Sequence, residues 1–109
     1  MNHELIVFVT TSTRDEASHI AEVLVSGQLA ACVNIIPSLE SIYRWEGKIA
    51  RDHEALMIIK TSEERYADLE RRIKELHSYA TPEVIAIKIE QGSADYLKWI
   101  RDSTKGDRQ

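Results

Sequence analysis

Cysteine, proline and glycine are all scarce in this sequence. Its 109 residues include one cysteine, two prolines and four glycines. A single thiol forms no internal disulfide and cannot by itself build a cysteine-rich metal site. So few glycines and prolines exclude a loop-rich or low-complexity chain. Because it lies in an apolar run, Cys32 is expected to be a buried structural thiol.

Long hydrophobic runs and a strong excess of basic charge are also missing. No apolar segment approaches the roughly 20 residues that cross a bilayer as a helix, and the N-terminus does not have the pattern of a signal peptide. The formal net charge of −4 argues against binding to a nucleic-acid backbone. We therefore expect one domain over residues 1–109, located in the cytoplasm, with no nucleic-acid or membrane partner.

The first part of the chain is predicted to form a strand and a helix. A β-branched run at residues 5–9 is typical of a strand that is buried on both faces. Thr13 and Glu16 have the spacing of a capping box, and the apolar residues after them recur at helical spacing. Gly27 follows at the point where a residue with a left-handed backbone often ends a helix.

A long hairpin is expected next. Its first arm covers residues 29–36 and continues after a bulge at Pro37-Ser38. The turn signal at 46–48 leads into a second arm that runs from 49 to 60. Each arm would exceed about 30 Å at ~3.3 Å per residue, which is more than one small domain can cover.

The rest of the chain is predicted to add a helix, a strand and a terminal helix. Thr61 and Glu64 have a second capping-box spacing, and charged residues fill the solvent side of the helix that follows. Residues 83–89 are expected to form a strand, and Gly92-Ser93 precede a short amphipathic helix. The polar tail 103–109 is expected to fray.

The predicted order is therefore β-α-β-β-α-β with a C-terminal helix. Two β-α-β units that share one antiparallel sheet form a ferredoxin-like α+β sandwich, in which helices cover one face of the sheet. The other face remains apolar because strand residues such as 56–59 show no polar alternation. Proteins cover or pair such surfaces. We therefore predict an oligomer in which the hairpin reaches onto a neighbouring subunit.

Several segments, in order and over nearly the whole chain, form a pattern that is specific to one family. They are Leu29-Ala30-Ala31-Cys32-Val33-Asn34-Ile35-Ile36-Pro37, Ser41-Ile42-Tyr43-Arg44-Trp45-Glu46-Gly47-Lys48, Lys60-Thr61, His77-Ser78-Tyr79-Ala80-Thr81-Pro82-Glu83 and Tyr96-Leu97-Lys98-Trp99. These segments resemble the CutA family of divalent-cation tolerance proteins. The resemblance implies a ferredoxin-like subunit in a homotrimer with the architecture of the PII signalling proteins. It also implies a non-catalytic role in tolerance of, or response to, divalent cations, above all copper.

The resemblance also identifies candidate copper ligands, of which this chain keeps one. Copper prefers soft or imidazole ligands. The family positions that hold a cysteine and two adjacent histidines correspond to Thr11 and to Leu76-His77. His77 is therefore the candidate metal ligand, with an interaction with the dipole at the end of its helix as the structural alternative. No cofactor is expected to be required, and the expected cation is copper or another divalent metal.

A set of aromatic and charged residues favours an alternative function, a PII-like sensor of a small anionic metabolite. Lys60 ends one buried strand and Glu83 starts another, and clefts form where strands end beside a subunit boundary. In such an intersubunit pocket, Lys60 would supply charge and Tyr79 a hydroxyl. The structural interpretation is that Tyr43 and Trp45 belong to an interface core and that Lys60 pairs with an acidic residue. The candidate pocket residues are Tyr43, Trp45, Glu54, Lys60, Tyr79 and Glu83.

The sequence carries no signature of catalysis. It contains no glycine-rich phosphate loop, no zinc-protease motif and no nucleophile elbow. A small hydrolase would need an arginine and an asparagine aimed at one phosphate. Arg44 and Asn34 lie on different parts of one predicted hairpin. We therefore predict that the protein is not an enzyme.

Overall fold

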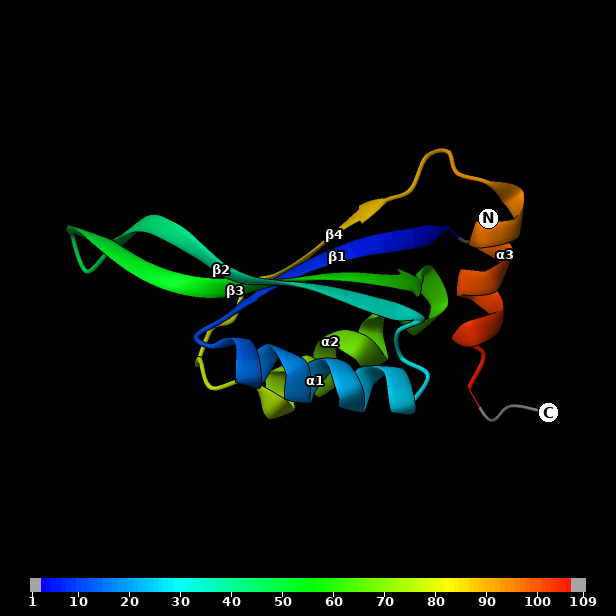
Figure 1. Cartoon of the computed structure of the whole chain (residues 1–109), viewed down its shortest axis with the longest axis horizontal. Helices are drawn as coiled ribbons and strands as arrows, with labels where there is room; N and C mark the ends of the chain where they lie inside the picture. Colours follow the sequence, from blue (N-terminus) through cyan, green and yellow to red (C-terminus); the bar gives the residue numbers. More distant parts are fainter. Residues whose placement is uncertain (1–2, 107–109) are drawn as a thin grey trace.

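The computed structural model describes residues 3–106 and contains a four-stranded antiparallel sheet with helices packed on one side (Figure 1). Its elements are β1 (Glu4–Thr11), α1 (Arg14–Ser26), β2 (Cys32–Trp45), β3 (Lys48–Ser62), the 3₁₀ turn η1 (Glu63–Arg65), α2 (Tyr66–Leu76), β4 (Val84–Lys88) and α3 (Ala94–Ser103). The strands lie in the order β2-β3-β1-β4, and every neighbouring pair is antiparallel. The predicted α+β class and order of elements are confirmed.

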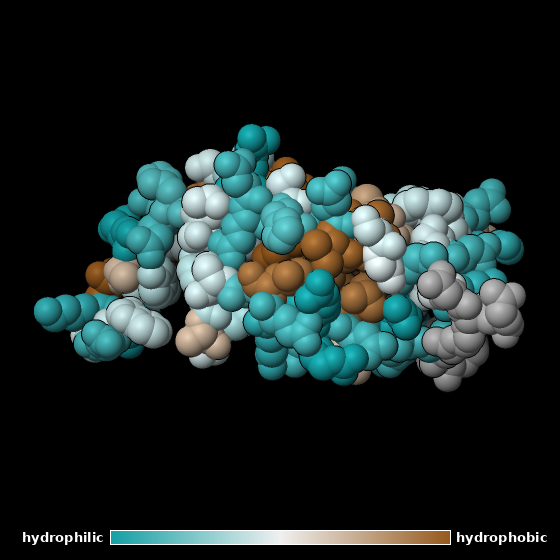
Figure 2. Space-filling model, turned by 90° about the horizontal axis from the view of Figure 1, so that it is seen from below, coloured by the Kyte–Doolittle hydropathy of each residue, from teal (hydrophilic) through white to brown (hydrophobic). Residues whose placement is uncertain are grey.

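The core lies between the sheet and helices α1 and α2. Alternate residues of β1 and β3, such as Val7 and Met57, point to this side and are fully buried. The apolar stripes of both helices pack against them, as helical periodicity predicts. Figure 2 shows the outer side of the helices, where hydrophilic residues surround a central hydrophobic area. The buried helix residues are Ala17, Ile20, Leu24, Leu69 and Ile73.

The second face of the sheet is apolar and is not covered by α1 or α2. Figure 1 shows both of these helices on one side of the sheet and α3 beside one end. Phe8 lies between Ile58 of β3 and Ile85 of β4 in the strand register, and Ile85 and Ile87 remain 55% and 53% exposed. The expectation that β1 is buried on both faces therefore fails on this side within one subunit. We call this surface the open face, and its residues are Ile6, Phe8, Ile36, Ile58, Ile85 and Ile87.

The β2–β3 hairpin extends well beyond the body of the subunit. Its strands have 14 and 15 residues, and the molecule measures 48 × 26 × 22 Å along its principal axes. The long axis follows the hairpin, whose tip is the far left end in Figure 1. The predicted long hairpin is therefore confirmed.

Two local features of the hairpin also agree with the sequence. The register shifts between Ile36 and Leu39, as expected beside Pro37. At the tip, Glu46 and Gly47 have φ angles of 50° and 79°, the left-handed pair that a tight hairpin turn requires. The first arm differs from expectation at its start, because β2 begins at Cys32 and not at Leu29.

The ends of the helices follow the sequence signals only in part. Thr13 accepts a hydrogen bond from the Glu16 backbone N–H at 3.1 Å and so caps α1 as predicted. Thr61 does not cap a helix, because β3 continues through Ser62 and the Thr61 hydroxyl donates to the Leu29 carbonyl at 2.7 Å. The prediction of a second capping box is therefore wrong.

The C-terminal segment is ordered further than expected. Thr104 follows α3 and is buried, with its hydroxyl 3.1 Å from Ser62 Oγ and 2.9 Å from the Ile100 carbonyl oxygen. The prediction that the tail frays from residue 103 is therefore wrong at this position, because Thr104 docks the end of α3 onto the end of β3. Residues 107–109, which the same prediction covers, lie outside the described residues. Among the helices formed by residues 3–106, none has the length and hydrophobicity of a membrane span.

The left-handed residue at the end of α1 is Gln28 and not Gly27. Gly27 has a φ of −85° and donates its N–H to the Val23 carbonyl, whereas Gln28 has a φ of 59°. The predicted left-handed position is therefore wrong by one residue. A β carbon in this conformation strains the backbone, and glycine has none.

Replacing Gln28 with glycine is expected to stabilise the protein by about 0.5–1 kcal/mol, because relief of the left-handed strain exceeds the entropy that glycine loses on folding. Urea unfolding at one fixed protein concentration measures this change. Gln28→Ala is the control, since it removes the same side chain but keeps the β carbon, and it should give no gain. Equal stability of the two variants would contradict the assignment of backbone strain to the left-handed conformation of Gln28.

Candidate functional site

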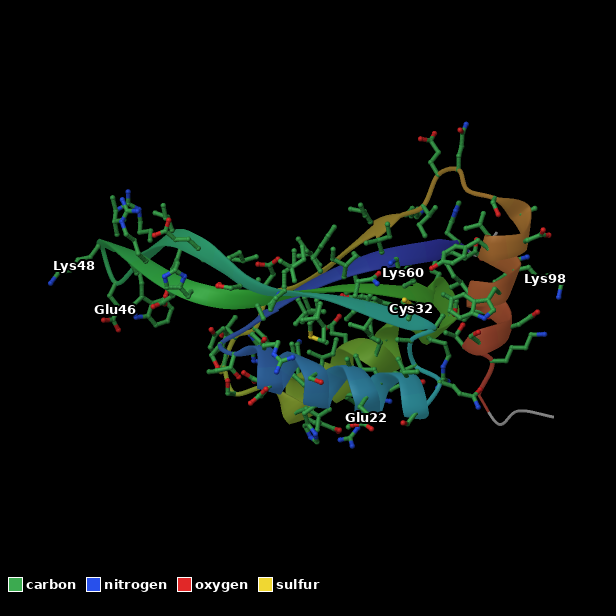
Figure 3. The ribbon with its side chains drawn as sticks, viewed as in Figure 1. Glu22, Cys32, Glu46, Lys48, Lys60 and Lys98 are labelled. Carbon is green, nitrogen blue, oxygen red and sulfur yellow. The ribbon has the colours of Figure 1, made fainter. Side chains whose placement is uncertain are left out.

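Within one subunit, the residues of the predicted pocket lie in separate places. Trp45 pairs with Lys48 at the tip of the hairpin. Lys60 pairs with Cys32 at the other end of the same two strands, and Figure 3 shows Lys48 and Lys60 far apart. A pocket that contains both Trp45 and Lys60 would therefore have to combine more than one subunit.

Glu54 and Tyr79 are the two pocket residues that the fold brings into contact. The Tyr79 hydroxyl donates to Glu54 Oε2 at 2.7 Å, and the Ser41 hydroxyl donates to Glu54 Oε1 at 2.6 Å. Burial and the bond to Glu54 raise the pKa of the Tyr79 hydroxyl, so it keeps its proton and remains a donor. One carboxylate thus joins β2, β3 and the loop before β4.

The other aromatic and charged pocket residues have local roles. Tyr43 donates its hydroxyl to Asp52 across the hairpin. Trp45 is 63% exposed, and Glu83 is exposed just before β4 begins. Within one subunit, Tyr43, Trp45 and Glu83 therefore do not form a pocket with one another.

His77 is a buried residue whose ring nitrogens both have protein partners. Its side chain is 0% exposed. The Tyr79 backbone N–H donates to Nδ1 at 3.0 Å, and Nε2 lies 2.7 Å from the Thr10 carbonyl oxygen. Since Nδ1 accepts a hydrogen bond, Nε2 carries the hydrogen and donates to Thr10. A metal ion could bind His77 only by displacing one of these partners.

Glu16 holds the same loop against α1, and sequence reasoning identified it only as half of a capping box. Its carboxylate accepts from the Ser78 N–H at 2.8 Å and from the Ser78 hydroxyl at 3.1 Å, and it lies 3.6 Å from His77 Nδ1. Burial alone would raise the pKa of the Glu16 carboxyl. Hydrogen bonds from the Ser78 backbone and side chain and from Ser12 outweigh burial and hold this pKa below its ordinary value.

Cys32, Asn34 and Lys60 form a small polar group on the sheet side that carries the open face. Lys60 donates its ammonium to Asn34 Oδ1, and Cys32 Sγ lies 3.9 Å from the same oxygen. Figure 3 shows Cys32 and Lys60 near each other, at the end of the sheet beside α3. Cys32 is a free thiol of intermediate burial. The full burial expected for it is therefore not reached within one subunit.

The donor set of one subunit does not fit a copper centre. Over residues 3–106, no three histidine, cysteine, aspartate or glutamate side chains lie close enough to hold a metal ion. His19 and His53 are exposed on α1 and β3, and both nitrogens of His77 are engaged. Copper prefers clustered soft or imidazole ligands, and the described residues of one subunit do not supply such a cluster.

The fold and the open face define the class of the protein. It is a ferredoxin-like α+β domain with one sheet face covered by helices and a second apolar face exposed beside a protruding hairpin. The family model described as CutA1 divalent ion tolerance protein matches residues 5–103. The chain therefore belongs to the CutA family, and the resemblance noted in the sequence is confirmed.

Individual relatives agree with this assignment. The chain is 44% identical over 101 residues to the divalent-cation tolerance protein CutA of Thermus thermophilus, covering 93% of this chain and 98% of that protein. It is 45% identical over 98 residues to human Protein CutA, covering 90% of this chain and 55% of that protein. The chain thus spans little more than half the length of the human relative.

Solved structures match over almost the full chain. The Cut A1 protein of Thermus thermophilus superposes with a TM-score of 0.91 at 44% identity, covering 93% of this chain and 98% of that one. The Archaeoglobus fulgidus CutA, described as periplasmic, has a TM-score of 0.91 at 39% identity, covering 94% and 99%. Plant relatives are named as chloroplastic, so the names of relatives differ in cellular location.

Proposed function

We propose that this chain forms a homotrimer through its open face and hairpin, and that the trimer serves tolerance of divalent cations without a catalytic step. The observation that carries the assembly is the open face, where Ile85 and Ile87 are exposed next to the half-buried Phe8. Contiguous apolar patches of this kind mark interaction sites. Closed symmetric assembly covers such a patch on every subunit. The family assignment supports the link to divalent cations.

The hairpin supports the same assembly. Ile42 and Ile49, near its tip, are 55% and 70% exposed, and they lie on the opposite face of the hairpin from Trp45. Apolar side chains on both faces of a protruding hairpin would be covered if the hairpin lay against neighbouring subunits. The proposed location is the cytoplasm, where a free Cys32 thiol stays reduced.

Native mass spectrometry of metal-free protein tests the assembly. We expect the spectrum at micromolar concentration to be dominated by a species with three times the mass of one chain. Dissociation in the gas phase should release single chains and dimers from that species. A monomer as the main species in solution would contradict the proposal.

Adding copper to the same sample tests whether the protein binds this cation. Uptake of a fixed number of ions per trimer would support copper binding, and loss of that uptake in His77→Ala would assign His77 as a ligand. The variant is compared only if its circular dichroism and mass match those of the folded trimer. A trimer that takes up no fixed number of ions would contradict copper binding and leave the proposed assembly intact.

A further inference from the structure

The β2–β3 hairpin leaves the body of the sheet at Glu54. β3 pairs with β1 from Ser62 as far as Ala55, opposite Thr11, and β1 ends there. Glu54 is therefore the first residue of β3 beyond this support. On β2, the register shift ends at Leu39, which is the partner of Glu54. The bulge and the end of β1 thus meet at one level, and the hairpin beyond it can bend relative to the sheet.

A chain of polar contacts crosses this level from the body to the hairpin. The Tyr79 hydroxyl holds Glu54 Oε2, and Glu54 Oε1 holds Ser41, the second β2 residue beyond Leu39. Both arms of the hairpin are therefore tied to one side chain of the loop before β4. A tyrosine ring is stiff, so it fixes the position of its hydroxyl better than a long aliphatic side chain would.

Tyr79 is itself held by the body of the subunit. Its backbone N–H donates to His77 Nδ1, and its ring lies 4.8 Å from the His77 ring. His77 is anchored to the Thr10 carbonyl on β1, and Ser78 is bound to Glu16 on α1. The loop is thus fixed to β1 through His77 and to α1 through Ser78.

We infer that Tyr79 is a positioning residue that sets the direction of the β2–β3 hairpin through Glu54. From Glu54 to the turn, the hairpin spans about 20 Å at ~3.3 Å per residue, so a tilt of about 10° at its base would move the tip by roughly 3–4 Å. Such a displacement would misplace the hairpin on a neighbour. This inference rests on the proposed function for its effect on assembly, because a preoriented hairpin loses less freedom when it binds.

Hydrogen exchange of Tyr79→Phe tests the inference. The substitution keeps the ring and removes only the hydroxyl bond to Glu54. We expect backbone amides of residues 39–54 to exchange about 2- to 10-fold faster, the range that corresponds to loss of one hydrogen bond, while those of α1 and α2 stay unchanged. Tyr43→Phe is the matched control, because the Tyr43 hydroxyl bonds Asp52 within the hairpin and makes no link to the body.

Glu54, which accepts the hydrogen bond from Tyr79, provides a second pair of variants. Glu54→Gln keeps one oxygen acceptor at the junction and replaces the other with an amide nitrogen that can donate to a hydroxyl oxygen, so it should retain slow exchange. Glu54→Leu removes both polar atoms and should behave like Tyr79→Phe. Unchanged exchange in Tyr79→Phe, or an equal increase in Tyr43→Phe, would overturn the inference. A monomeric wild type in native mass spectrometry would contradict the proposed trimer instead, and the exchange comparison would still decide the role of Tyr79.

Discussion

Ile85→Glu is expected to convert the proposed trimer into folded monomers. In a single subunit the Ile85 side chain is 55% exposed on the open face, so a glutamate there would stay hydrated and the subunit would fold. In the trimer the same position would lie in an apolar interface, where an unpaired charge costs several kcal/mol. Because every subunit would carry the charge, assembly should weaken by roughly a thousandfold or more. Sedimentation velocity at micromolar concentration measures the change.

Val25→Glu is the matched control for this prediction. Val25 is also an exposed aliphatic residue, at 42%, but it lies on α1 on the other side of the sheet. The control should therefore sediment like the wild type. Circular dichroism should give the same secondary structure for both variants. A trimeric Ile85→Glu, or equal dissociation of the two variants, would show that the open face is not the interface.

The order of the elements could be predicted because each depends on local patterns. The apolar spacing of α1 and α2, the β-branched run of β1 and the turn at Glu46-Gly47 are each contained in a few consecutive residues. The bulge beside Pro37 is of the same kind, since proline cannot donate to a strand ladder. The apolar second face followed from the missing alternation in β3. These features required no knowledge of which distant residues meet.

Two of the errors arose where a distant partner decided the outcome. Thr61 has the spacing of a capping residue with Glu64, but its hydroxyl bonds the Leu29 carbonyl and β3 continues past it. Thr104 belongs to a polar tail by composition, yet it is buried beside Ser62. A pattern of neighbours along the chain contains no information on such contacts.

The candidate site was predicted as a list of residues but not as an arrangement. The sequence marks both Glu54 and Tyr79 as candidates, yet nothing in it indicates that they bond to each other across 25 positions. Ser41 and Glu16 were missed as partners, because their roles depend on contacts with Glu54 and Ser78. His77 was selected for its imidazole, and its burial against Thr10 could be seen only in the fold.

His77→Leu is expected to destabilise the protein by about 3 kcal/mol. Leucine fills a similar volume but leaves the Thr10 carbonyl and the Tyr79 N–H without partners in a part-buried position, and each unsatisfied group costs about 1–3 kcal/mol. The melting temperature should fall by about 13 °C at equal protein concentration. Differential scanning calorimetry measures this shift.

His19→Leu is the control for that measurement, since His19 is an exposed histidine on α1 and its replacement should change stability by less than about 0.5 kcal/mol. Equal stability of the two variants would mean that the bonds of His77 contribute little and that its nitrogens are available to a metal. A large loss in His77→Leu alone would identify the imidazole as a structural bridge from β1 to the loop before β4. In that case, a loss of copper uptake in His77→Ala would count as evidence for a ligand only after the trimer had been shown to remain folded.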